Sequence, residues 1–245
     1  IKSEIYTNTK KELVYTLDNY LKAKKDIGIT NAFSIANDGQ IKTSLELKDR
    51  VLAINSLKNI NQTLKNGTKY KNIKIHIHTK DNKSYLRNWK PNKHGDDLST
   101  FRQSIVKVNN TKQAINGFEI GKAGLSLRSV VPIVEDGTHL GSLEFIQGLN
   151  SVSKLLNKNN DGFLLLMDID KKIVSPKPEK VFKEKYVISQ KFINDDFFNS
   201  VKNININNLL NNEFIIDSKY FYTYIDIKDF KGNKLGIAIV ARPIA

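Results

Sequence analysis

The first 28 residues constrain the fold more than any other segment, because they contain no Pro and only one Gly, at position 28. A helix over residues 3–28 is about 39 Å long at ~1.5 Å per residue, which exceeds the width of one small domain. Such a helix either spans two domains or projects from them. Its apolar residues recur at helical spacing, at Ile5, Leu13, Leu17, Tyr20, Leu21 and Ile27.

After this segment the hydrophobic period changes from helical to alternating. Two shorter helices are expected first, over residues 32–41 and 47–65. Ile73, Ile75 and Ile77 then alternate with polar residues, which predicts a strand with one apolar face. We expect the rest of this set to comprise a partner strand over 84–89, a helix through about 108, and strands over 117–120, 125–134 and 139–146.

A second set of elements repeats the order of the first. The sequence predicts a linking helix over 151–156, strands over 163–169 and 173–174, a helix over 195–201, and strands over 213–216, 220–226 and 235–241. Each set closes on Leu-Gly before its last strand, in HLGSLEFI from His139 and KLGIAIVA from Lys234. We therefore predict an α+β fold: a long N-terminal helix (1–28) followed by two lobes with antiparallel sheets (29–148 and 149–245).

The formal charge of +14 raises the question of a nucleic-acid partner. Lysines are spread along the whole chain, and no zinc-finger, helix-turn-helix or aromatic RNP pattern accompanies them. We expect no nucleic-acid partner. A basic protein that binds nucleic acid or another anionic polymer remains the alternative from a different functional class.

The sequence also restricts the chemistry available to the chain. Its 245 residues include no Cys, which excludes disulfides, Cys-based zinc sites and thiol nucleophiles. No G-x-S-x-G, H-E-x-x-H or phosphate-binding glycine loop is present, so we expect neither an enzyme nor a cofactor. No apolar run reaches the ~18–20 residues of a membrane span. Because both ends look cut, we expect a domain of a longer protein.

Three segments together resemble the double Cache family of extracytoplasmic sensor domains. They are Ile75–Val106 with its R-x-W segment and GDDL turn, GFEIGKAGLSLRSVVPI from Gly117, and GSLEFIQG from Gly141. The resemblance implies that both lobes are PAS-like Cache lobes and that the lobe over 29–148 is membrane-distal and binds the ligand. It also implies the periplasmic sensory domain of an inner-membrane chemotaxis receptor, anchored in the membrane and homodimeric at full length. A histidine kinase or diguanylate cyclase sensor is the alternative within this family.

Arg87 and Trp89 are the first candidate ligand-binding residues. If both lie on one strand, their side chains share a face, and a guanidinium beside an indole suits a carboxylate with an apolar skeleton. In amino-acid-sensing relatives an R-x-W-Y segment and a later Asp hold the ligand; here Lys90 replaces the Tyr, and the later acid would be Glu119. We therefore expect a carboxylate-bearing or amino-acid-like metabolite. The alternative role for Arg87 is a structural pair with Asp96 or Asp97.

Three further residues complete the predicted site. Arg128 lies in a mid-sheet strand and needs a partner, either Glu119, Glu144 or a ligand carboxylate. Arg102, after the GDDL turn, could face the pocket or that turn. His76 lies on the polar side of its strand with His78, where we expect surface or pocket-lining imidazoles and no metal, because a closed zinc site requires four ligands.

Overall fold

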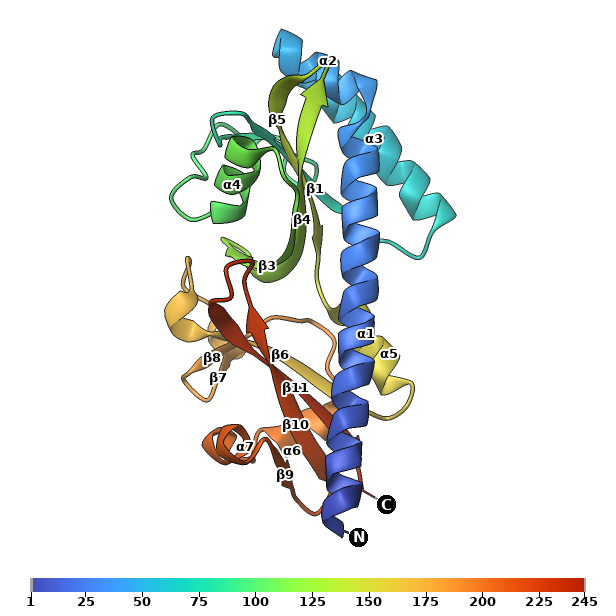
Figure 1. The fold of residues 1–245 in the computed structure, drawn as a ribbon, viewed down its shortest axis with the longest axis vertical. Helices are drawn as coiled ribbons and strands as arrows, with labels where there is room; N and C mark the ends of the chain where they lie inside the picture. Colours follow the sequence, from blue (N-terminus) through green and yellow to red (C-terminus); the bar gives the residue numbers. More distant parts are fainter. Residues whose placement is uncertain (1, 245) are drawn as a thin grey trace. The chain divides into compact units, whose positions relative to one another are not determined.

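The computed structural model describes residues 2–244, which divide into two compact units. The middle unit contains Lys24–Gly121 and Leu127–Gln147; the terminal unit contains the described residues up to Ala23, Lys122–Ser126 and those from Gly148 onward. Each unit has its own antiparallel sheet, and helix α1 (Lys2–Ala36) contributes residues to both units (Figure 1). The predicted α+β fold with a long N-terminal helix and two antiparallel sheets is confirmed.

Helix α1 is longer than predicted, because it continues through Gly28 to Ala36. The expected helices over 32–41 and 47–65 are replaced by α2 (Gly39–Leu47) and α3 (Arg50–Gly67). Side-chain caps fix both starts: Asp38 accepts a hydrogen bond from the backbone N of Ile41 at 3.0 Å, and Asp49 accepts one from Val51 N at 3.0 Å. The helix boundaries therefore follow the aspartates and not the glycine.

Gly28 permits a close approach between α1 and the middle sheet. A Cβ atom at this position would come within 2.4 Å of Ser129 Oγ and 2.5 Å of Gln147 Nε2. Two side-chain amides fasten this stretch of helix: Gln147 donates to the carbonyl of Lys24 at 2.8 Å, and Asn116 to that of Lys25 at 2.9 Å. The absence of a side chain at Gly28 makes room for these contacts.

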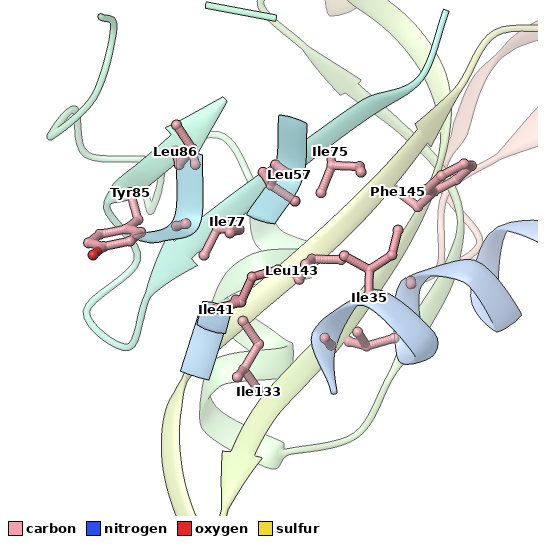
Figure 2. Close-up of a cluster of buried hydrophobic side chains, with 14 of the residues drawn as sticks. Ile35, Ile41, Leu57, Ile75, Ile77, Tyr85, Leu86, Ile133, Leu143 and Phe145 are labelled. Atoms are coloured by element: carbon pink, nitrogen blue, oxygen red, sulfur yellow. The ribbon is translucent and has the colours of Figure 1, made fainter. Parts of the chain in front are cut away.

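The middle sheet has the strand order β2-β1-β5-β4-β3. One face packs on α1, α2 and α3 through a buried apolar cluster, part of which Figure 2 shows. Helix α4 (Gln103–Thr111) lies by the other face (Figure 1). The strands are β1 (Lys74–Thr79), β2 (Ser84–Arg87), β3 (Ile115–Gly121), β4 (Gly124–Glu135) and β5 (Thr138–Gln147).

The terminal sheet has the order β7-β8-β6-β11-β10-β9. The strand predicted over residues 173–174 is wrong: these residues are exposed and lie between the 3₁₀ turns η1 (Ile169–Lys171) and η2 (Pro178–Lys180), and β6 pairs with β8 instead. Helix α7 was not predicted. The elements are α5 (Asn150–Asn157), β6 (Gly162–Asp168), β7 (Val181–Phe182), β8 (Tyr186–Ile188), α6 (Asp195–Val201), α7 (Ile206–Asn212), β9 (Phe214–Ile216), β10 (Tyr220–Lys228) and β11 (Lys234–Pro243).

An ion-pair cluster in the terminal unit joins α1 to the last strand. Arg242 of β11 donates to both carboxylate oxygens of the buried Asp161, at 3.0 and 3.1 Å, and to Glu12 of α1 at 2.8 Å.

None of the helices described between residues 2 and 244 is both long and apolar enough to cross a membrane.

Candidate functional site

The candidate site begins on the polar face of β1. Ile75 and Ile77 enter the apolar cluster against the helices, so His76 and His78 point to the opposite face of the sheet. Both imidazoles are buried, with 3% and 0% exposure, and are not surface groups. In the neighbouring strand β5, Glu144 lies directly opposite His76.

Glu144 is the centre of a buried hydrogen-bonded network. Arg102, at the start of α4, binds both of its carboxylate oxygens, at 2.9 and 2.5 Å, and Arg128 of β4 reaches one of them at 3.3 Å. His76 Nδ1 lies 3.0 Å and His78 Nε2 lies 3.4 Å from Glu144 Oε1. An ionised carboxylate only accepts hydrogen bonds, so both ring nitrogens donate to it.

Glu119 of β3 answers the rest of Arg102. Its Oε2 accepts from Arg102 Nε at 3.1 Å, and its Oε1 accepts from the backbone N of Ser104 at 3.0 Å; the Ser104 hydroxyl also donates to this carboxylate. Glu119 of β3 therefore caps the first turn of α4, and its negative charge is favourable next to the N-terminus of this helix. Arg128 Nε donates to the backbone carbonyl of Glu119 at 3.4 Å.

These contacts leave the network neutral as a whole. Burial alone would raise the pKa of Glu144, but Arg102 and Arg128 hold that pKa well below its ordinary value. Burial and then the neighbouring His78 lower the pKa of His76 to about 3, and burial lowers the pKa of His78 as well. Two guanidinium groups thus face two carboxylates, and both imidazoles stay uncharged at neutral pH.

Arg87 has the geometry of the structural alternative considered for it. Its two Nη atoms bind the two carboxylate oxygens of Asp96, each at 2.8 Å, and Nη1 also donates to the carbonyl of Lys93 at 2.7 Å. Arg87 therefore fastens the loop over residues 91–97 to the end of β2.

Trp89 does not share a strand face with Arg87, because β2 ends at Arg87 and Trp89 lies in the following turn. Strand alternation therefore does not place this pair, although both residues lie next to His76, which Arg87 faces across β1 and β2. The indole is 41% exposed. It packs edge-on to His76, with ring centroids 5.9 Å apart, so Trp89 forms the exposed margin of the network.

The donor set of the network does not suit a divalent cation. The ligand atoms of His76, His78 and Glu144 all lie within 4.8 Å of one another, which is compatible with one ion. Arg102 and Arg128, however, already bind the carboxylate of Glu144. A buried divalent cation beside these two guanidinium groups would add positive charge that no group in the network neutralises.

The network also contains hydrogen bonds of the kind found in acyl-transfer enzymes. The Ser84 hydroxyl lies 2.8 Å from His76 Nε2, and His76 Nδ1 binds Glu144. Ser84 is only 2% exposed, so a substrate has no access to this hydroxyl. The arrangement orients the imidazole and satisfies its second nitrogen.

Of the predicted site residues, the structure brings together His76, Arg102, Glu119 and Arg128; Arg87 and Trp89 lie at the margin. Sequence reasoning underestimated Glu144, which it treated only as a possible partner of Arg128, and His78, which it treated as a surface or pocket-lining group. The available signal was the pair of polar residues Ser142 and Glu144 at the same parity inside an apolar strand.

Comparisons with known proteins agree with this architecture. The sequence profile of the dCache_3 family, described as the double sensory domain of two-component sensor kinases, matches residues 6–245. No curated protein sequence matches the chain.

Solved structures resemble the chain along nearly all of its length. The sensor domain of the Vibrio cholerae histidine kinase DctB has a TM-score of 0.58 at 12% identity, with 100% of both chains covered. A domain of a sensory box/GGDEF family protein from Vibrio parahaemolyticus has a TM-score of 0.53 at 16% identity, covering 99% of this chain and 97% of that one. The ligand-binding domain of the Campylobacter jejuni chemoreceptor Tlp3, solved with L-valine, has a TM-score of 0.50 at 14% identity, covering 99% and 95%.

At these identities the solved structures support the fold, whereas the family profile covers almost every residue of the chain. Members of this family are sensory domains that bind ligands and do not catalyse reactions, in agreement with the expectation of no enzyme. The chain belongs to the dCache_3 family of double sensory domains.

Proposed function

We propose that this chain is the periplasmic ligand-sensing domain of an inner-membrane receptor and that its membrane-distal lobe, predicted over residues 29–148, binds a small anionic or zwitterionic metabolite. The observation that carries the proposal is the neutral buried network around Glu144, which lies on one face of the middle sheet. Its partners Arg102, Arg128 and His76 come from three different elements, so a ligand at its margin can act on all of them.

The charge balance determines where a ligand carboxylate can enter. Each arginine is already paired with an acidic side chain, so an anionic ligand must displace one of these acidic side chains to reach an arginine. Asp96 is the most exposed of the three acids, with 25% of its side chain accessible, against 9% for Glu119 and 0% for Glu144. We therefore place the ligand carboxylate on Arg87 in exchange for Asp96, with Trp89 against its carbon skeleton.

The test compares affinity and stability in Arg87→Ala. We expect it to weaken binding of a carboxylate ligand, found by a thermal-shift screen of metabolites, by about 2–5 kcal/mol, as for a truncated buried charge pair. Asp96→Asn should strengthen binding by removing the competing charge. If Arg87→Ala only lowers the melting temperature without ligand and leaves affinity unchanged, Arg87 is solely structural.

The output of the receptor is a separate question. We propose a methyl-accepting chemotaxis receptor that is a homodimer at full length. Ligand binding shifts the equilibrium between two arrangements of the helix and the lobe, and this change in packing is the signal. The description of the family favours a second candidate, the sensor of a histidine kinase. The full-length protein in membranes distinguishes them: ligand-dependent methylation supports the first, and ligand-dependent autophosphorylation the second.

The isolated domain should be a monomer or a weak dimer, because membrane anchoring normally supplies the effective concentration. Binding of an anionic polymer is the alternative from another class. A salt titration separates the two, since affinity for a polyanion falls steeply with salt whereas a buried small-molecule site responds little.

A further inference from the structure

A cavity of about 210 Å³ lies between α3 and the end of β2 in the middle unit. Its apolar walls are Ile54 and Leu57 of α3, Leu86 of β2, and Pro91. Leu86 pairs with Ile77 in the sheet and shares its face, as the cluster in Figure 2 shows. The cavity is therefore on the helix side of the sheet, opposite the Glu144 network.

Two polar groups of α3 border this cavity. Asn61 Oδ1 is buried and has no hydrogen-bond partner among the described residues, an unfavourable state for a carbonyl oxygen. Lys58 lies one helical turn earlier on the same face, is exposed, and forms no ion pair within residues 2–244. The cavity thus presents one acceptor without a donor and one cation without an anion.

The neighbouring groups do not donate a hydrogen bond to Asn61 Oδ1. The side-chain amide of Asn88, which also borders the cavity, is engaged by β1: it accepts from Ile75 N at 3.0 Å and donates to the carbonyl of Ile73 at 2.9 Å. Arg50 fixes the walls, because it donates to the carbonyls of Pro91 at 2.6 Å and Tyr85 at 3.0 Å and so ties β2 to the start of α3. The cavity is pre-formed.

We propose that this cavity is a second ligand site, for a short aliphatic hydroxycarboxylate. The hydroxyl donates to Asn61 Oδ1, the carboxylate pairs with Lys58, and the alkyl chain lies against Ile54, Leu86 and Pro91. An α-amino acid suits the cavity less well, because its ammonium adds a second positive charge near Lys58 and no acidic side chain lines the cavity to balance it. The site does not depend on the proposed function, because it uses none of the residues of the Glu144 network.

The experiment is calorimetric titration of the purified chain with 2-hydroxy-4-methylpentanoate. Two matched compounds identify the contacts: 4-methylpentanoate lacks the hydroxyl, and leucine replaces it with an ammonium. We expect each to bind at least about tenfold more weakly than the hydroxy acid. No binding of the hydroxy acid at millimolar concentration, or equal binding of all three, would overturn the proposal.

Variants then locate the site. Asn61→Leu and Lys58→Met should each weaken binding by at least about tenfold, whereas the controls Asn55→Leu and Lys65→Met, on the same helix outside the cavity, should not. Asn61→Leu should melt at the same or a higher temperature, since it removes an unsatisfied oxygen. Undiminished binding by Asn61→Leu contradicts the proposal, and if that variant does not fold, the compound without a hydroxyl decides. Asn61 and Lys58 belong neither to the Glu144 network nor to the Arg87–Asp96 pair, so failure of these variants is separate from failure of the proposed function.

Discussion

The two sheets are built alike but differ in what they bury. In the middle unit β1 lies between β2 and β5, and in the terminal unit β6 lies between β8 and β11. Where His76 faces Glu144 on the α4 side of the first sheet, Leu166 faces Ile237 in the apolar cluster that packs on α6 and α7 in the second. A similar strand order therefore accommodates an apolar face, and the strand order by itself does not require a charged network. Replacing buried ion pairs with apolar residues is often neutral or stabilising, which is consistent with a role beyond stability.

The largest expected effect comes from removing the centre of that network. Glu144→Gln leaves Arg102 and Arg128 buried without their shared carboxylate, and should cost about 3–5 kcal/mol of unfolding free energy, measured by urea denaturation. A loss below about 1 kcal/mol would mean that water reaches these groups and that the two sheets differ less than their burial indicates.

Acid should weaken the middle unit through its imidazoles. The folded pKa of His76, about 3, lies below its ordinary value of 6.5, so the unfolded chain binds more protons, and stability is lost as pH falls from about 6.5 toward 3. His78 and His139 have lowered pKa values and act in the same direction, and the depressed pKa of Glu144 adds to the loss at the acid end.

Each fully buried imidazole can contribute up to about 1.4 kcal/mol per pH unit in this range. The measurement is unfolding free energy against pH. His76→Gln should reduce the slope between pH values of about 6.5 and 4.5, while His94→Gln, at an exposed position, should not. Equal slopes in all three proteins would contradict the assignment.

The repeated Leu-Gly marks a feature that the two sheets share. A Cβ on Gly141 would lie 2.2 Å from the carbonyl oxygen of His78, and one on Gly236 would lie 1.9 Å from that of Leu166. Gly141→Ala and Gly236→Ala should therefore both destabilise the protein, by about 1–3 kcal/mol or more, in thermal denaturation. Gly117→Ala is the control, because no atom lies within 4 Å of its added methyl group.

The smallest effect is expected at the terminal ion-pair cluster. Glu12 is largely exposed, so Glu12→Gln should change unfolding free energy by at most about 1 kcal/mol, although its 2.8 Å contact with Arg242 is shorter than some contacts of Glu144. A loss of unfolding free energy as large as that of Glu144→Gln would show that burial does not determine how much an ion pair contributes to stability.

Periodicity was sufficient to predict the order of most elements, because apolar alternation and turn residues are local signals. It failed where tertiary contacts decide. Gly28 suggested the end of a helix, but its small size instead serves packing against Ser129 and Gln147. Residues 173–174 are apolar, but they are followed by Pro176 and Pro178, and β8 takes the place beside β6.

The candidate site was predictable in kind more than in arrangement. Arg128 was identified because a charged group inside an apolar strand requires a partner, and Glu119 was one of the partners considered for it. Arg102 was identified by its place after the GDDL turn, and His76 by the polar face of its strand. The role of Glu144 was underestimated because β5 is buried on both faces, so alternation does not distinguish a network residue from a core residue. The burial of His78 was not expected because alternation along β1 marks its face as polar but does not show that this face is covered. Trp89 was misplaced because β2 ends two residues before it, at Arg87.

The amides of Asn116 and Gln147 reach α1 through carbonyl oxygens, which every residue type carries. These two hydrogen bonds therefore survive substitution of either lysine, even though the Lys25 side chain also lies over the Phe118 ring, whereas Gly28 tolerates almost no substitution. Over evolutionary time such a helix can change its exposed side chains, and with them the proteins that it binds, while its packing on the sheet stays the same.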